Sequence, residues 1–235
     1  MTNDLMLELS DINTFYDTSH VLFGISMEIW KEDAVCLVGR NGAGKSTTLL
    51  SIMGVKPPST GRIRFMGQDV TGKRPYRISR MGIGLVPQER RIFEDLTVLE
   101  NLIITADKKG AGWQVDDVYD LFPKLKNLEK RWGGSLSGGE QQMLAIGRTL
   151  LTNPRLLMLD EPGEGLSPMV VQDMVKGIQA LKNQGMTILL AEQNVNFASK
   201  ISERAYVIEK GQIRYSGSMG ELIGNDEVKS KYLSV

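Results

Sequence analysis

The apolar positions of this chain alternate between runs of strand length and stripes with helical spacing. Residues 34–38 form a continuous apolar run, which is typical of a strand buried on both faces of a sheet. Similar runs return later in the chain, at residues 156–159, 187–191 and 205–208. Between the first two of these later runs, apolar residues follow one face of a helix, namely Val171, Met174, Ile178 and Leu181. Strands that alternate with helices predict a mainly parallel sheet.

Two segments depart from this alternation. Residues 6–29 have the pattern of short strands with turn residues between them, and Ile63 and Phe65 alternate with arginines as in a half-exposed strand. Residues 90–152 have mostly helical spacing, although Pro123 must bend or interrupt a helix there. The pattern therefore predicts an α/β core with a helical insertion.

A glycine-rich loop follows the first buried run and precedes a helix expected over residues 45–53. Residues 39–46 match the P-loop pattern, in which backbone N–H groups surround a phosphate and the following helix directs its positive end there. We expect Lys45 to reach the β- and γ-phosphates and Ser46 to place its hydroxyl on Mg²⁺. A chance glycine turn is the alternative, but the flanking strand and helix favour nucleotide binding. The expected contacts of ATP in this loop are Gly39, Arg40, Asn41, Gly42, Ala43, Gly44, Lys45, Ser46 and Thr47.

Two adjacent carboxylates end the apolar run at residues 156–159. Asp160 and Glu161 would point to opposite faces of a strand, so we expect them to have different roles. Asp160 would hold the Mg²⁺ shell, through water, and Glu161 would act on the attacking water as a general base or positioning group. Solvated acids at a strand end are the alternative, and the presence of the P-loop favours the functional interpretation.

Composition narrows the classes of protein that fit this pattern. The 28 basic and 28 acidic residues give zero net charge, so no overall field would hold nucleic acid, and no nucleic acid is expected as a partner. One cysteine and one histidine can form neither an internal disulfide nor a Cys/His zinc site. Charges interrupt every apolar run well short of the ~20 residues of a membrane helix, and no secretory signal is visible at the N-terminus. We therefore expect a cytoplasmic protein.

The sequence Leu-Ser-Gly-Gly-Glu at residues 136–140 identifies the family. Ser137 is a good helix N-cap, and two glycines at a helix start allow the close approach of an anion. Together with the P-loop and with Asp160 and Glu161, this segment makes the chain resemble the nucleotide-binding subunit of ABC transporters.

The resemblance implies a fold and an organisation. The fold is that of P-loop NTPases, with a RecA-like, mainly parallel sheet and an N-terminal antiparallel β part. Residues 1–235 would form one nucleotide-binding domain, with residues 1–89 and 153–235 as its catalytic α/β core. Residues 90–152 would form the inserted helical subdomain that carries the signature.

The resemblance also implies roles for particular residues. ABC ATPases work as pairs in which ATP on one P-loop is covered by the signature helix of the other subunit. Gln88 matches the glutamine that senses Mg²⁺ and water and couples to the membrane subunit, and Tyr16 matches the aromatic residue that stacks on adenine. Arg90 and Arg91 either are solvated or meet the membrane subunit. The residues that would serve the partner's ATP are Ser137, Gly138, Gly139 and Glu140.

Two departures from the general family pattern narrow the resemblance. Gln193 stands where most members have a histidine that touches the γ-phosphate, and Ser167 replaces the usual acidic residue of a loop at the dimer interface. A glutamine amide can donate to a phosphate oxygen but cannot become an imidazolium. Together these features resemble one of the two ATPases of branched-chain amino acid importers.

That subfamily implies ATP and Mg²⁺ as cofactors and several protein partners. The expected partners are a sister ATPase, integral permease subunits and, indirectly, a periplasmic or extracellular solute receptor; pairing of the chain with itself is the alternative to the sister ATPase. The chain would then lie on the inner face of the cell membrane, bound through the permease. Two other functions stay open, an importer of urea or short amides and a soluble ABC ATPase without a role in transport.

Overall fold

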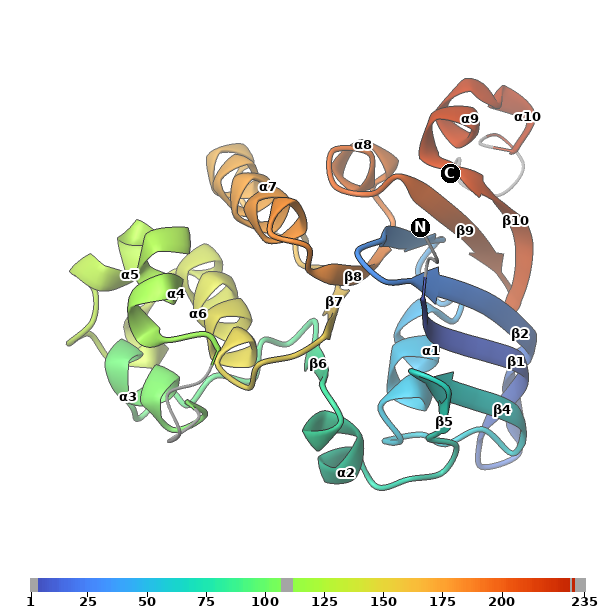
Figure 1. Cartoon of the computed structure of the whole chain (residues 1–235). Helices are drawn as coiled ribbons and strands as arrows, with labels where there is room; N and C mark the ends of the chain where they lie inside the picture. The colour runs from blue at the N-terminus through green and yellow to red at the C-terminus, as the bar shows by residue number, and fades with distance from the viewer. Residues whose placement is uncertain (1–3, 107–111, 229, 231–235) are drawn as a thin grey trace.

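Two β-sheets and a group of helices build the fold (Figure 1). The computed structural model describes residues 4–106, 112–228 and 230. Within this part, a six-stranded sheet has the spatial order β10 (Gln212–Ser218), β9 (Arg204–Glu209), β3 (Ala34–Val38), β8 (Thr187–Glu192), β7 (Leu156–Asp160) and β6 (Ile83–Val86). All neighbouring strands of this sheet run parallel except β10, which is antiparallel to β9. The predicted mainly parallel sheet is confirmed.

The central strands are apolar along most of their length because both of their faces are covered. Every residue of β3, β7 and β8 is buried. Leu157 and Leu159 of β7 pack with α6 (Gly138–Leu150) and α7 (Pro168–Asn183), whereas Leu156 and Met158 pack with α1 (Lys45–Ile52) and the second sheet. Successive side chains of a strand point to opposite faces, so one run of apolar residues supplies two cores.

The second sheet is antiparallel, as the resemblance implies. Within the described residues its four strands have the order β2 (Ser19–Trp30), β1 (Leu5–Tyr16), β4 (Thr60–Phe65) and β5 (Gln68–Asp69). The prediction of several short strands over residues 6–29 is wrong, because the segment forms only two long strands. Its turn-type residues Asp11 and Gly24 adopt positive φ within those strands, where the pairing register shifts. A β-bulge absorbs such residues without ending the strand.

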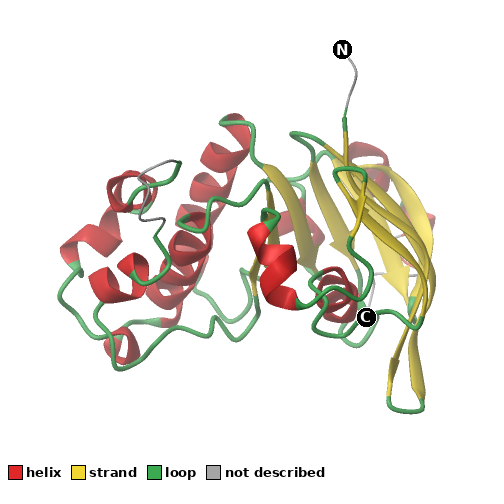
Figure 2. Cartoon of the chain, turned by 60° about the horizontal axis from the view of Figure 1, so that its bottom comes forward, coloured by secondary structure: helices red, strands yellow, loops and turns green. Residues whose placement is uncertain are grey.

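The helices between β6 and β7 lie at one end of the molecule, and the strands of both sheets lie at the other (Figure 2). Pro123 interrupts the helical structure as predicted, since α4 ends just before it and α5 begins with it. The helices of this segment are α3 (Val98–Ile103), α4 (Val115–Leu121), α5 (Pro123–Asn127), the 3₁₀ turn η1 (Gly133–Ser135) and α6. The remaining helices are α2 (Pro75–Arg80), α8 (Val195–Ala198), α9 (Met219–Gly224) and α10 (Asp226–Val228). None of the helices in the described ranges is long and apolar enough to span a bilayer.

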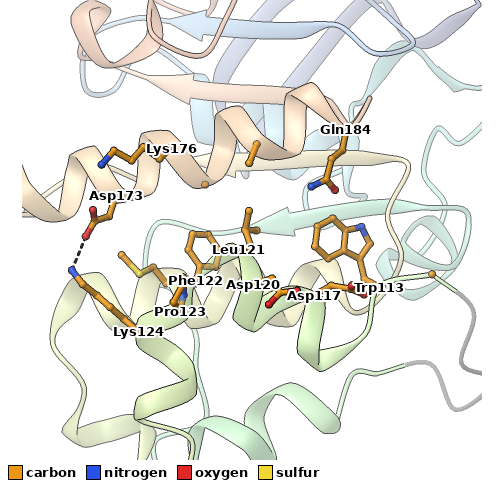
Figure 3. A pocket seen from close by; sticks show the side chains of 14 residues that line it. Trp113, Asp117, Asp120, Leu121, Phe122, Pro123, Lys124, Asp173, Lys176 and Gln184 are labelled. Carbon is orange, nitrogen blue, oxygen red and sulfur yellow. Dashed lines mark hydrogen bonds and ion pairs between the residues drawn. The ribbon is translucent and has the colours of Figure 1, made fainter.

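A cavity of about 750 Å³ lies where α4 and α5 face α7 (Figure 3). Lys124 and Asp173 form an ion pair of 2.6 Å at its edge, and Phe122 packs against Gly177 of α7. The candidate site residues named above do not line this cavity. It belongs to the contact between the helical segment and the core.

Candidate active site

The loop of residues 39–44 connects the end of β3 to the start of α1. A Cβ atom on Gly39 would lie 2.5 Å from the carbonyl oxygen of Ile208, and Gly42 and Gly44 have φ values of 76° and 113°. Glycine is therefore required for the path of this loop. Because three of its six residues are glycines without side chains, and because α1 begins here with free N–H groups, the loop is suited to bind an anion.

Lys45 is almost fully buried and reaches back over the same loop. Its ammonium donates to the carbonyl oxygens of Gly39 at 2.7 Å and Arg40 at 3.1 Å. It also forms an ion pair of 2.9 Å with Glu161, in which the side chains are only 3% and 9% exposed. A phosphate held by the loop would therefore compete with Glu161 for this ammonium.

Ser46 and Asp160 meet although they belong to different elements. The Ser46 hydroxyl donates to Oδ1 of Asp160 at 3.1 Å. Burial, with the nearby charge of Glu161 as a smaller cause, raises the pKa of Asp160 to about 6. A hydroxyl and a carboxylate are oxygen ligands of the kind that Mg²⁺ uses beside substrate phosphates, and a bound cation would favour the charged form of Asp160. Among the described residues no group of three or more His, Cys, Asp or Glu could hold a metal by itself, so phosphate oxygens and water would complete such a shell.

Glu161 follows β7 in a left-handed backbone conformation, with φ at 45°. Its N–H donates to the carbonyl of Ala191 at 2.9 Å, which ties the turn to β8. Positive φ is uncommon outside glycine and is concentrated at functional sites. The two adjacent acids have different surroundings, since Asp160 faces Ser46 and Glu161 faces Lys45.

Gln88 lies beyond β6 and shares a hollow of about 410 Å³ with Ser46 and Asp160. Its amide does not contact either of them in this structure and instead donates to the carboxylate of Glu164. The motif pattern does not single out Glu164. Its place in the loop that follows Glu161 is the one signal in the sequence that points to it.

Gln193 is exposed at the end of β8, beside β3 and the P-loop. The neighbouring Glu192 is buried and accepts backbone N–H groups of Gln193 at 3.1 Å, Asn194 at 3.2 Å and Gly163 at 3.4 Å. Burial raises the pKa of Glu192 to about 7. Glu192 thus links the turn after β8 to the loop after β7, a role that its strand-end position in the sequence does not reveal.

Tyr16 and the signature residues belong to other elements, the end of β1 and the start of α6. Tyr16 ends β1 and is 39% exposed, with the Lys56 ammonium 4.5 Å from its ring centre. Ser137 caps α6 in a capping box, in which its own N–H donates to Glu140 at 2.8 Å. Figure 1 shows α6 beside α3, α4 and α5, across β7 from α1. The two helices therefore pack against opposite faces of the central sheet.

This fold and this loop define a nucleotide-binding ATPase of the P-loop class. The family model described as ABC transporter matches residues 22–164. The chain is 42% identical over 231 residues to the high-affinity branched-chain amino acid transport ATP-binding protein BraG of Pseudomonas aeruginosa, covering 97% of this chain and 99% of that protein. It is 37% identical over 234 residues to the probable branched-chain amino acid transport ATP-binding protein LivF of Archaeoglobus fulgidus, with 98% and 99% coverage.

The fold comparison agrees with the sequence comparison. The solved structure of MJ1267, an ATP-binding cassette of an ABC transporter in its ADP conformation, superposes with a TM-score of 0.81 at 29% identity, covering 96% of this chain and 97% of that one. The chain belongs to the ABC transporter family of ATP-binding proteins. It is an ATPase with the P-loop NTPase fold, as the motifs indicate.

Proposed function

We propose that this chain hydrolyses ATP to drive the uptake of branched-chain amino acids through a membrane permease. One observation carries the proposal: Lys45 with Glu161 and Ser46 with Asp160 meet at the carboxyl edge of β3 and β7, next to a glycine loop. The names of the two relatives, both branched-chain amino acid transport proteins, support the substrate class. Gln193 in place of a histidine supports the same subfamily.

The proposed chemistry is attack of water on the γ-phosphorus of ATP, with ADP as the leaving group. The loop N–H groups and Lys45 hold the phosphates and neutralise their charge. Glu161 orients the water and accepts its proton. Ser46, Gln88 and Asp160, the last through water, would hold Mg²⁺, which would supply charge neutralisation to the phosphates when bound. Tyr16 stacks on the adenine, and Gln193 donates a hydrogen bond to the γ-phosphate.

The proposal includes a second ATPase subunit. The start of α6, from Ser137 to Glu140, would cover ATP on the partner's P-loop, and the partner's signature would cover ATP on residues 39–47. A sister subunit is the expected partner, and a second copy of this chain is the alternative. We further propose that residues 1–235 act as one domain, with a core of residues 1–89 and 153–235 and a helical subdomain of residues 90–152.

The permease is proposed to bind at the hollow that Gln88 lines. Thr105 and Arg148 line this hollow, and exposed apolar side chains adjoin them: Phe93 is 47% exposed and lies under the Arg148 guanidinium, and Ile104, just before Thr105, is 58% exposed. Exposed apolar residues beside a hollow are typical of a protein interface. The chain would accordingly lie on the inner face of the membrane, held through the permease, with the solute receptor on the other side.

Uptake measured in cells tests this proposal. Cells that lack the gene, supplied with the wild-type chain or with Lys45→Ala, are given labelled leucine, isoleucine, valine or urea. We expect the wild type to restore uptake of the three amino acids and Lys45→Ala to restore none. Restored uptake of urea alone would favour the alternative importer, and co-purification with soluble proteins only would contradict a role in transport.

A further inference from the structure

Arg90 lies against the first residue of the signature helix. A Cβ atom on Gly138 would be 3.2 Å from Nη1 and 3.3 Å from Nη2 of Arg90, so the guanidinium covers the start of α6. The Nε atom of Arg90 is buried and has no hydrogen-bond partner within the described part of the chain. No acidic side chain of the described residues forms an ion pair with Arg90 either.

This position of a cation is electrostatically unfavourable in the isolated chain. The N-terminus of a helix carries partial positive charge from its free N–H groups, and α6 begins at Gly138. Glu140 contributes a negative charge to the first turn of α6, and its carboxylate accepts the N–H of Ser137 in the capping box. A guanidinium beside a helix N-terminus favours the binding of an anion there.

The chain holds Arg90 there with specific contacts. Arg90 and Arg91 both have positive φ, at 63° and 48°, which places two uncommon backbone conformations in succession. Arg148 of α6 fixes this turn, because its guanidinium donates to the carbonyls of Arg91 at 2.5 Å and Arg90 at 3.4 Å. The neighbouring Arg91 pairs with Glu89 instead, at 3.7 Å, with its side chain 71% exposed. The two arginines thus have different surroundings.

We propose that Arg90 binds the terminal phosphates of the ATP held on the partner's P-loop, together with the signature residues. The inference rests on the proposed function, in which Ser137, Gly138 and Gly139 meet that ATP. A planar guanidinium beside a row of helix N–H groups matches the oxygens of a phosphate. Arg90 would thus report occupancy of the partner's site to the Gln88 segment, with which it shares one loop.

The test measures ATP-driven pairing, that is, dimerisation, of purified full-length chains. These chains carry Glu161→Gln to prevent hydrolysis, and the partner ATPase subunit is added where one is required. Arg90→Met retains the length of the side chain without its charge, Arg90→Lys retains the charge, and Arg91→Met is the matched control. We expect Arg90→Met to raise the ATP concentration for half-maximal pairing about 10- to 100-fold, the range of a charge-assisted hydrogen bond. Arg90→Lys should recover part of this loss, and Arg91→Met should match the parent.

A second measurement separates a role in trans from one in cis. ATP affinity of the unpaired chain, measured by calorimetry, should be the same in the parent and in Arg90→Met. An equal loss of affinity in the unpaired chain, unchanged pairing in Arg90→Met, or equal impairment by Met and Lys would overturn the inference.

Gly138→Asp distinguishes this inference from the proposed function. If Gly138→Asp abolishes pairing and Arg90→Met leaves it intact, only the role of Arg90 is wrong. If neither substitution changes pairing, the use of the signature by a partner is wrong as well.

Discussion

Replacement of Glu161 by glutamine should tighten the binding of ATP while it removes hydrolysis. Lys45 is shared between the loop carbonyls and Glu161, and the 2.9 Å ion pair lies in a nearly dry environment. ATP must draw this ammonium toward its phosphates, so the carboxylate of Glu161 opposes binding. Glu161→Gln keeps the shape and a hydrogen-bond acceptor but removes the opposing charge.

The size of the effect follows from the geometry of the pair. Two unit charges at this separation attract by about 6 kcal/mol at an effective dielectric constant of 20, before the cost of removing them from water. A net charge-assisted hydrogen bond contributes about 1.5–3 kcal/mol, which corresponds to roughly 10- to 100-fold in the dissociation constant of ATP. Loss of a general base at the same time lowers turnover by about 10²- to 10⁴-fold.

Calorimetric titration of the unpaired chain with ATP, in parallel with phosphate release, measures both quantities. Glu203→Gln is a suitable control because it removes one negative charge from an exposed pair with Lys182, outside the site. ATP affinity that is unchanged or weaker in Glu161→Gln would refute the reasoning, since it would mean that the ion pair does not compete with the phosphates. Equal tightening in the control would assign the effect to overall charge.

Four further substitutions test separate parts of the site. The pKa of Glu192 is raised from 4.5 to about 7, so its contribution to stability is full below pH 4.5 and is lost as the pH rises to 7. Relative to Glu192→Gln, the wild type should therefore lose about 3 kcal/mol of unfolding free energy between these pH values. Urea denaturation at several pH values measures this loss. Gly39→Ala should abolish ATP binding because its methyl group meets the Ile208 carbonyl, whereas Gly42→Ala, with open space around it, should cost only about 1–2 kcal/mol of backbone strain in thermal unfolding. Gln193→Ala should lower ATP turnover of the assembled transporter several-fold through loss of one hydrogen bond, and unchanged turnover would remove its proposed role.

Local patterns are sufficient to predict β9, β3, β8 and β7, the four inner strands of the six-stranded sheet, whereas the edge strands β6 and β10 were not predicted. Strands β3, β7 and β8 could be predicted because each is a short, mostly apolar run. Helix α7 could be predicted because Met174, Ile178 and Leu181 recur with helical period, and all three are buried. The antiparallel sheet was harder, since its bulges at Asp11 and Gly24 use residue types that also form turns. Alternation cannot distinguish a bulge from a strand end when the register of the neighbouring strand is unknown.

The P-loop and the paired acids were predictable as residues, but their contacts were not. The pattern places Lys45 and Glu161 in one site without indicating that they pair with each other. Arg90, Glu164 and Glu192 belong to no short motif, and their surroundings depend on segments far apart in the chain: Arg90 touches α6, Glu164 accepts from Gln88, and Glu192 accepts from Gly163. Such contacts are set by tertiary packing, which no window of the sequence contains.

The arrangement of charge explains why zero net charge is compatible with binding of a polyanion. Asp160, Glu161 and Glu192 lie at the same edge of the sheet, with Lys45 as the cation paired to one of them, and Glu161 adds to the raised pKa of the other two beyond the effect of burial. The phosphates are received by backbone N–H groups, which carry no formal charge, and the excess of carboxylates is suited to the cation that accompanies ATP. Anion and cation are thus bound by different parts of the chain, and ATP with Mg²⁺ complements both parts at once. Free phosphate, in contrast, would be repelled by the carboxylates because it brings no cation to compensate their charge.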